Sequence, residues 1–429
     1  MDRILAHVVK LTRSIALYPI DADKRPSVQF FPGRPSSFMF AGGISLSWWF
    51  NTETYRAVAA ISSLILETDP EFRDCDLETL KTIINNTIQE ICCDARFFKT
   101  DDVMFRAQSN LFACKADIAV QDFASDILHE IKVRLRNAVG KRCTIYPLTR
   151  FLGPSFSIPE LGLHAIARAD TLGWGKLEEM GYLFDGWSPE SPHMQNFDAA
   201  FPARLNFNYA LVSAEYGTQK GTKFSSLLKL RVLIAIMFAI ASEKSICTYH
   251  KAMAQPNTQC VQFPHSTCPD PRLVFSDCGA LSPFYASDVP LDHSHILELT
   301  SWYGALARCT PQFKQRIEKA SYFVNRGMNS GDIEAYINYF VALDALFGER
   351  GSVETSIARG INRLGLGIEM EKKSTWLFDL RNELVHGGSR FIEEWPKFHR
   401  YVRHYESSPL DDLKKLVQKA ILKVTSWSD

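Results

Sequence analysis

Apolar residues recur at helical spacing in three stretches of the first 136 residues, which predicts amphipathic helices at 53–67, 77–94 and 117–136. The pattern then changes to short β-rich segments separated by Pro and Gly, as is typical of strands. The expected strands are residues 142–148, 154–158, 161–166, 203–213, 246–250 and 260–263. In the fourth of these, Leu205, Phe207, Tyr209 and Leu211 alternate along the chain, so we expect them on one face. A nearly continuous apolar stretch at 223–242 predicts a helix buried against the sheet.

From residue 291 the periodicity is helical again, with expected helices at 291–307, 332–347, 352–364 and 395–405. The second of these carries one apolar stripe and ends at Gly348; the stripe comprises Ile333, Tyr336, Ile337, Phe340, Leu343 and Phe347. The predicted fold class is therefore α+β. We expect a mixed α/β N-terminal region at 1–285, with room for two subdomains and an irregular linker at 264–290, followed by an all-α bundle at 286–429.

Composition places the chain among ordinary soluble proteins, with 46% hydrophobic and 22% charged residues. A formal net charge of +0 argues against a high-affinity, non-specific DNA binder. The N-terminal apolar positions are interrupted by charges, unlike a signal peptide. The most apolar run, at 232–241, is half of the roughly 20 residues that span a bilayer. We expect a cytoplasmic protein with no membrane partner.

The ten cysteines are scattered and form no CxxC motif, so we interpret them as reduced and mostly buried thiols. One cluster of potential metal ligands lies in a Pro-rich span, but its spacing fits no zinc signature. Its members are His250, Cys260, His265, Cys268 and Cys278. No metal and no cofactor are therefore expected.

Two further motifs have the composition of catalytic sites without the required pattern. The segment 217–223 contains the glycines and lysine of a phosphate loop at the wrong spacing, which favours an exposed turn before a helix. Asp126, Glu130 and Lys132 imitate a metal-dependent nuclease motif, which needs its acids on strands. Here they lie in a helical pattern, so a solvated helix face is the better interpretation.

The most informative motif is Arg381-Asn382-Glu383-Leu384-Val385-His386, followed by two glycines. An Arg can clamp a phosphate and a His can move a proton near neutral pH. These two groups suffice for metal-free RNA cleavage, in which the ribose 2′-hydroxyl attacks the neighbouring phosphate. The alternative is a surface helix whose last turn carries a His before a Gly C-cap.

The order of elements around this motif carries a family resemblance. The string YFVALDALFG, a short polar helix and then WLFDLRNELVHGG resemble the Apea-like group of the HEPN superfamily, over roughly residues 290–429. The resemblance implies that Arg381 and His386, with Asn382, form a ribonuclease site, supported by Asp344 and Glu383. The family usually has Glu where this chain has Asp344. Five helical residues place Arg381 about 140° from His386, and the family pairs two such helices across a dimer axis.

Basic residues after the motif are candidates for RNA binding: Lys397, Arg400, Arg403 and His404. Trp395, Phe398 and Tyr401 could stack on bases, and Arg359 and Arg363 could reach phosphates. The competing interpretation is an ordinary amphipathic helix with its aromatic residues in the core.

Together these features predict a homodimeric, metal-independent endoribonuclease that cleaves cellular RNA such as tRNA. The resemblance implies a toxin or antiviral-defence effector, with a protein or nucleic-acid trigger bound by the N-terminal region. The alternative is a non-catalytic HEPN-type module that binds RNA or nucleotide and dimerises; a plain interaction scaffold is a third possibility.

Overall fold

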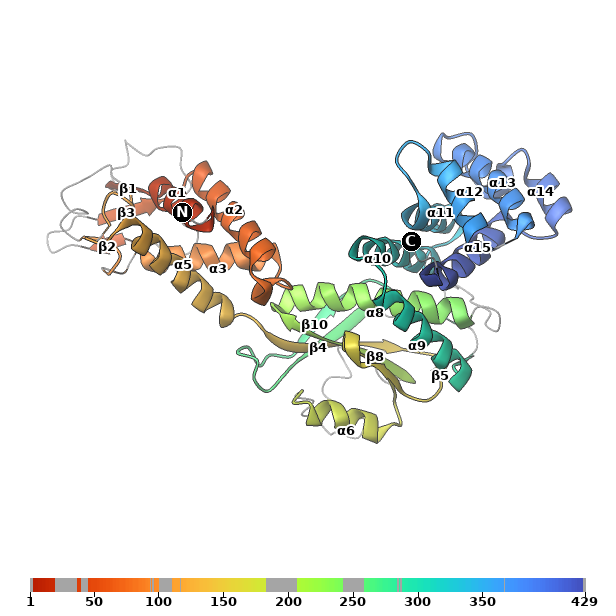
Figure 1. Cartoon of the computed structure of the whole chain (residues 1–429), viewed down its shortest axis with the longest axis horizontal. Helices are drawn as coiled ribbons and strands as arrows, with labels where there is room; N and C mark the ends of the chain where they lie inside the picture. The colour runs from red at the N-terminus through yellow and green to blue at the C-terminus, as the bar shows by residue number, and fades with distance from the viewer. Residues whose placement is uncertain are drawn as a thin grey trace. The chain divides into compact units, whose positions relative to one another are not determined.

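The computed structural model describes residues 3–19, 37–39, 45–92, 94, 96–99, 110–115, 117–182, 207–241, 258–283, 285, 288–365 and 367–426 (Figure 1). The chain divides into two compact units. Unit 1 comprises residues 1–142, 216–222 and 267–271, and unit 2 comprises residues 143–215, 223–266 and 272–429.

Unit 1 packs helices around one apolar core beside a small antiparallel sheet of order β1-β3-β2. Its elements are α1 (Arg3–Ser14), β1 (Ala16–Pro19), β2 (Ser37–Met39), β3 (Ser45–Trp49), α2 (Thr52–Thr68), the 3-10 helix η2 (Pro70–Phe72), α3 (Leu77–Ile91) and α5 (Val120–Arg136). The side chains of Asn51 and Asp76 cap α2 and α3 by accepting backbone N–H bonds. All three helices predicted for this region are confirmed.

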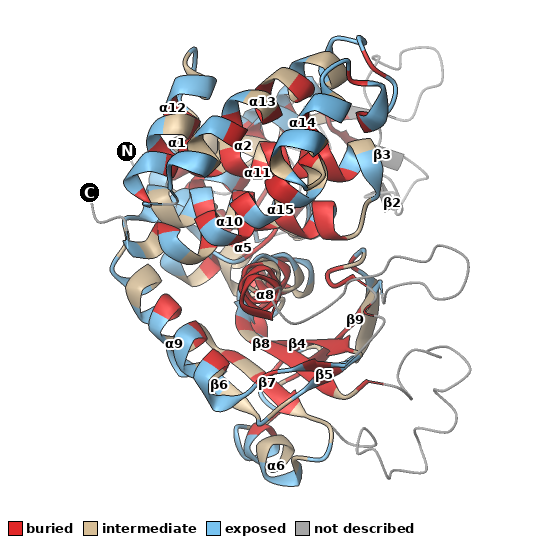
Figure 2. Cartoon of the chain, turned by 90° about the vertical axis from the view of Figure 1, so that its right-hand side faces the viewer, coloured by how far each residue is buried: buried red, intermediate tan, exposed pale blue. Residues whose placement is uncertain are grey.

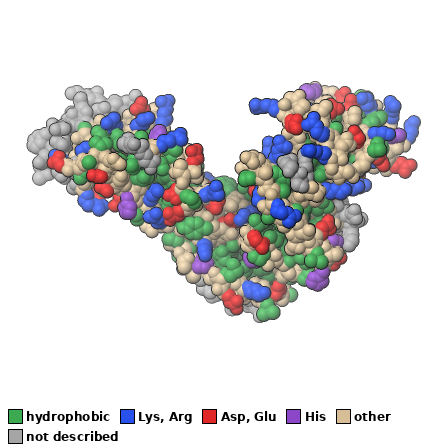
Figure 3. Space-filling view, viewed as in Figure 1, with side chains coloured by type: hydrophobic (Ala, Val, Ile, Leu, Met, Phe, Trp, Pro, Cys, Tyr) green, Lys and Arg blue, Asp and Glu red, His purple; other side chains and the backbone are tan. Residues whose placement is uncertain are grey.

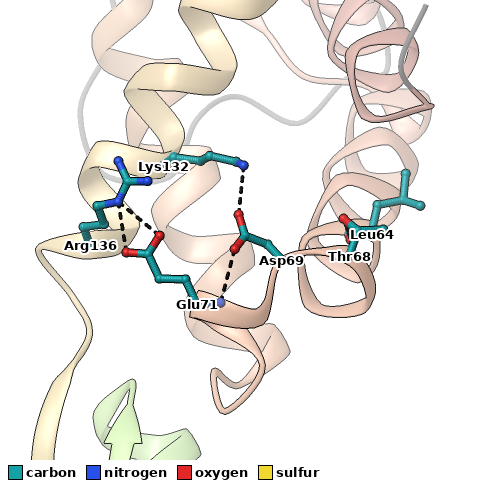
Figure 4. A network of polar contacts seen from close by, with 6 residues as sticks. All are labelled: Leu64, Thr68, Asp69, Glu71, Lys132 and Arg136. Atoms are coloured by element: carbon teal, nitrogen blue, oxygen red, sulfur yellow. Dashed lines mark hydrogen bonds and ion pairs between the residues drawn. The ribbon is translucent and has the colours of Figure 1, made fainter.

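A polar network at the edge of unit 1 joins α5 to the turn after α2 (Figure 4). Lys132 Nζ donates to Asp69 Oδ2 at 2.8 Å, and Arg136 Nε donates to Glu71 Oε1 at 2.9 Å. Asp69 also caps η2 by accepting the Glu71 N–H. Burial opposes ionisation of Asp69, but the hydrogen bonds from Lys132 and the Glu71 N–H, together with the charges of Lys132 and Arg136, outweigh it, and the pKa of Asp69 lies below its ordinary value.

Unit 2 contains most of a six-stranded sheet with the order β10-β9-β4-β8-β7-β6. The strands are β4 (Gly140–Leu148), β6 (Phe156–Ile158), β7 (Leu163–Ala167), β8 (Tyr209–Gly217), β9 (Gln259–Pro264) and β10 (Val274–Asp277). Strand β7 pairs antiparallel with both β6 and β8, with Ala165 opposite Leu211 in the latter pair. A separate parallel pair joins β5 (Phe151–Leu152) to β11 (Val289–Pro290).

Both faces of this sheet are covered by helices. Tyr209 and Leu211 of β8 pack into a core shared with α8 (Gln219–Ala241), whereas the alternate residues Ala210 and Val212 pack on the other face with α6 (Thr171–Glu179). Figure 2 shows α8 against the sheet with buried residues around it. This is the one helix of the described chain that is long and apolar enough to cross a membrane, and 72% of its most apolar window is buried. The predicted buried helix is thus confirmed as a core helix.

The C-terminal part of unit 2 is helical, and its apolar residues belong to the same core as α8. Its elements are α9 (His293–Ala307), α10 (Pro311–Met328), α11 (Asp332–Phe347), α12 (Val353–Arg363), α13 (Ile368–Val385), η5 (Ile392–Glu394), α14 (Phe398–Tyr405), α15 (Pro409–Lys423) and η6 (Val424–Ser426); η3 (Pro159–Leu161) lies earlier, between β6 and β7. The α+β class predicted from the sequence is confirmed.

Several expected details differ in the structure. The segment 264–290 is not wholly irregular, because it contains β10, which pairs antiparallel with β9, and the short β11. The expected boundary near residue 285 lies inside unit 2. Phe207 precedes β8 and packs on the face opposite to Tyr209 and Leu211. The predicted strand at 246–250, like Leu205, lies outside the described residues.

A buried ion pair joins the last helices of the bundle. Lys373 Nζ of α13 lies 3.0 Å from Asp412 Oδ2 of α15, and their side chains are 7% and 3% exposed. The Tyr401 hydroxyl of α14 donates to the same Asp412 oxygen at 2.8 Å, and Ser407 Oγ donates at 2.5 Å. Burial, and secondarily the bond to Asp412, raises the pKa of Tyr401. The Lys373 ammonium also lies 4.9 Å from the centre of the Tyr405 ring. One carboxylate therefore sets the positions of three helices.

We expect Asp412→Ala to lower the free energy of unfolding by about 3–5 kcal/mol, because it leaves the Lys373 ammonium buried without its partner. Glu369→Ala is the matched control: Glu369 also pairs with Lys373, at 3.4 Å, but its side chain is 75% exposed, so its loss should cost below about 1 kcal/mol. Urea unfolding of the full chain, followed by circular dichroism, measures both. Equal midpoints for the two variants would contradict the central role of Asp412.

Candidate functional site

The last turn of α13 carries the Arg-x4-His motif, and its geometry explains the two glycines that follow. His386 is the C-cap residue, and its N–H donates to the Asn382 carbonyl at 2.9 Å. Gly387 adopts φ +80°, a conformation that disfavours residues with a Cβ. The Gly388 N–H then donates to the Glu383 carbonyl at 2.8 Å. This is the Schellman arrangement, so the glycines end the helix directly after the motif.

Arg381 is half-buried and lines a small pocket of about 210 Å³. Its Nη1 donates to Asn382 Oδ1 at 3.0 Å. Asp344 of α11 lines the same pocket, so the structure brings the predicted supporting carboxylate to the side of Arg381, although no ion pair joins them among the described residues. The rest of the lining is apolar: Ile337, Phe340, Val341, Val353, Phe378 and Val385.

His386 and Asn382 are exposed at the helix end, and His386 is not part of the lining of this pocket. Within the described residues the His386 ring makes no hydrogen bond. The Glu383 carboxylate lies against Gly388 in the turn after the helix, since a Cβ added there would meet Glu383 Oε2. One chain therefore presents an Arg–Asp pocket and, apart from it, an exposed imidazole, as the helical spacing of the motif predicts.

The candidate RNA-binding residues of α14 differ in their availability. Lys397 Nζ donates to Asp379 Oδ1 at 2.8 Å, so its charge is compensated. The Arg400 guanidinium lies 5.3 Å from the centre of the Trp376 ring. Arg403 is exposed, and the His404 ring packs beside that of Tyr405. In the view of Figure 3, acidic and basic side chains are interspersed over this bundle and form no continuous basic patch.

The aromatic residues expected to stack on bases are mostly part of the core. Trp395 is 2% exposed and Tyr401 is fully buried. The Trp395 Nε1 donates to Asp379 Oδ2 at 2.9 Å, which anchors η5 to α13. Phe398 is half-buried against the same core. The amphipathic-helix interpretation therefore describes α14 better than a stacking platform does.

A second, more polar pocket of about 490 Å³ gathers three arginines. Arg359 and Arg363 of α12, which the sequence marked as possible phosphate contacts, line it with Arg316 of α10. Arg359 pairs with Glu349 at 3.3 Å, and Arg316 donates to the Leu346 carbonyl at the same distance. Sequence reasoning missed Arg316, because α10 was not among the predicted helices.

The remaining candidate motifs have structural explanations. A Cβ at Gly217 or Gly221 would lie 2.3 or 2.0 Å from the Asp74 carbonyl oxygen, so close backbone approach requires these glycines. Asp126, Glu130 and Lys132 all lie on α5, which confirms the helical interpretation of that motif. Lys132 is engaged with Asp69.

The residues weighed as metal ligands, His250, Cys260, His265, Cys268 and Cys278, do not form a metal site in the described part of the chain. Cys260, Cys268 and Cys278 are buried free thiols, and Cys268 packs against Gly140. A hydrogen bond from Cys278 lowers the pKa of Cys260. His265 Nε2 lies 2.9 Å from the Met180 carbonyl oxygen, and His250 lies outside the described residues. Among the residues described, no group of three His, Cys, Asp or Glu side chains is placed to hold a metal ion.

Comparisons with protein-family models, with curated proteins and with solved structures give no match to this chain. A function for this chain is therefore inferred from the residues themselves and from the family resemblance that their order carries.

The geometry of the helix end gives a direct prediction. Gly387→Ala should lower the free energy of unfolding by about 1 kcal/mol and increase amide exchange at residues 381–386, because Ala at φ +80° is strained. Gly388→Ala is the matched control, since its Cβ would meet only the flexible end of the Glu383 side chain. Urea unfolding and hydrogen exchange measure the two effects. Equal responses of both variants would show that the left-handed turn does not end α13.

Proposed function

We propose that this chain is a metal-independent endoribonuclease whose C-terminal helices form a HEPN-type bundle. The observation that carries the proposal is the arrangement at the end of α13. The Arg381 guanidinium lines a pocket with Asp344 and has no ion-pair partner among the described residues, and an exposed His386 follows about 1.4 helical turns later. A fixed cation and a titratable imidazole are the two groups that metal-free RNA cleavage requires.

In the proposed reaction, the substrate supplies its own nucleophile. His386 accepts the proton of the ribose 2′-hydroxyl, whose oxygen forms a bond to the adjacent phosphorus while the bond from phosphorus to the 5′-oxygen breaks. Arg381 stabilises the added negative charge on the phosphoryl oxygens, and Asn382, bonded to its Nη1, orients the guanidinium. The imidazolium of His386 formed in this way then protonates the leaving 5′-oxygen. The products are a 2′,3′-cyclic phosphate and a 5′-hydroxyl.

Further basic residues of the bundle provide contacts for the RNA backbone in this proposal. Arg400, Arg403 and His404 are exposed on α14, whereas Lys397 contributes less because Asp379 compensates its charge. By the resemblance, we also propose a cytoplasmic toxin or antiviral-defence effector that cleaves RNA such as tRNA. The N-terminal region then binds a protein or nucleic-acid trigger.

We expect Arg381→Ala and His386→Ala each to lower RNA cleavage by at least about 10²-fold, since each removes a group that acts in the transition state. Arg381→Lys should fail as well, because a point charge does not reproduce the planar fork of the guanidinium. The matched controls are Arg390→Ala and His399→Ala, which remove exposed side chains of the same types from the same region. The assay is cleavage of total tRNA by purified full-length variants with unchanged circular dichroism.

The same assay tests the chemistry. Cleavage should persist in EDTA, leave cyclic phosphate ends, and stop when the ribose at the cut site is replaced by 2′-deoxyribose. Normal cleavage by folded His386→Ala protein would instead favour the non-catalytic RNA-binding module. Cutting of the deoxy substrate would exclude the 2′-hydroxyl as the nucleophile.

The separation of Arg381 from His386 leads to a prediction about assembly. If two α13 helices complete one site, light scattering should give about twice the chain mass at working concentrations. Mixing Arg381→Ala with His386→Ala should then restore part of the activity, because a mixed dimer still holds one Arg and one His. A fully active monomer, or no recovery in a demonstrated mixed dimer, would contradict a composite site.

A further inference from the structure

A third pocket in unit 2 has the character of a small-molecule site. Its volume is about 530 Å³, within the roughly 300–1,000 Å³ typical of ligand pockets. Helices α8, α9 and α10 form its walls together with β6, η3 and β7; Figure 2 shows α9 beside β6. The lining is mostly apolar and includes Ile158, Leu161, Leu163, Val232, Leu306 and Ile317.

Two polar groups among the lining residues of this pocket lack hydrogen-bond partners among the described residues. The Tyr303 side chain is 4% exposed, and its buried hydroxyl makes no hydrogen bond. The Glu318 carboxylate is half-buried and makes neither a hydrogen bond nor a salt bridge. Burial raises the pKa of Glu318, and the charge of Lys229 opposes this rise without cancelling it. A polar group that is removed from water without a partner is costly, so the half-buried Glu318 carboxylate favours a ligand that supplies one.

The cations around the pocket are already engaged. Lys229 Nζ lies 2.7 Å from Glu215 Oε1 and donates to the Leu161 carbonyl at 3.0 Å. Lys314 Nζ donates to the Ala307 carbonyl at 2.9 Å. Neither lysine pairs with the Glu318 carboxylate, so a ligand with hydrogen-bond donors and a positive charge would complement this pocket.

We propose that this pocket binds a small molecule with a flat apolar body and a cationic, hydrogen-bond-donating group, such as an amidine or amine. The apolar walls, which include Tyr303, enclose the body, and the donor group faces Glu318. The site does not include Arg381, Asp344 or His386, so it stands independently of the proposed ribonuclease.

Benzamidine is a suitable probe, because its planar amidinium matches a carboxylate and its ring matches the apolar walls. Calorimetric titration of the full chain should give a Kd of about 1 mM or tighter, as the size of the probe allows. Benzoate, which has the same shape and the opposite charge, should bind at least about tenfold more weakly. Glu318→Gln should weaken benzamidine binding at least about tenfold, because it removes the charge that pairs with the amidinium.

Leu306→Trp, which fills the pocket without changing its charge, should abolish binding, whereas Glu334→Gln, an exposed carboxylate on α11, should leave it unchanged. Each variant is first checked for an unchanged circular dichroism spectrum and unfolding midpoint. Absence of benzamidine binding by the folded wild-type chain would overturn the proposal. So would equal affinity for benzoate, or an unchanged affinity in Glu318→Gln.

Discussion

The buried carboxylate of Asp412 is the constraint on which the geometry of the bundle depends. A charge removed from water must be paired and hydrogen-bonded, and Asp412 meets this need through Lys373 of α13 and Tyr401 of α14. Sliding any of these helices by one residue would separate a buried donor from its acceptor. The Tyr336 hydroxyl adds a further restraint by donating to the Leu377 carbonyl at 2.7 Å. Helix α13, which carries Arg381, is thus held in place by neighbouring elements before the motif begins. Lys373 lies about two turns before Arg381 and Leu377 about one turn before it.

The sequence predicted those elements in which the spacing of apolar residues and the residues that end the element indicate the same structure. Helices α2, α11 and α12 follow from a 3.6-residue apolar period, α8 follows from a nearly continuous apolar stretch, and Gly348 ends α11 as expected. Strand β10 has only four residues, all but one half-buried, and its pairing with β9 rather than its sequence defines it. Phe207 shows a similar limit: alternation assigns it to the face of Tyr209, yet the strand begins only at Tyr209, and Phe207 packs on the other side.

The candidate site was predictable only as far as its contacts are local. The local order of Arg381, Asn382, His386 and Gly387 is sufficient to predict where the helix ends. It also predicts the angle between the two catalytic candidates around the helix axis. The pairing of Lys397 with Asp379 joins residues from different segments, and it removes a charge that local reasoning had counted as available for RNA. The burial of Trp395 likewise involves a contact between different segments, because its indole N–H donates to Asp379. Basic and aromatic residues on one helix indicate a nucleic-acid surface only when nothing else in the fold uses them.

In the family that the chain resembles, Glu usually stands where this chain has Asp344, and the shorter side chain affects Arg381. A longer carboxylate lining the same pocket as Arg381 could reach the guanidinium and form a bidentate pair, which a phosphate would then have to displace. Asp344 lines that pocket without such a pair, so the fork of Arg381 keeps donors for an incoming anion while a nearby negative charge still favours one orientation. The apolar remainder of the pocket limits screening by water, which strengthens any charge interaction that a phosphate makes there. In a ribonuclease of the proposed kind, the shorter carboxylate thus positions Arg381 without neutralising it.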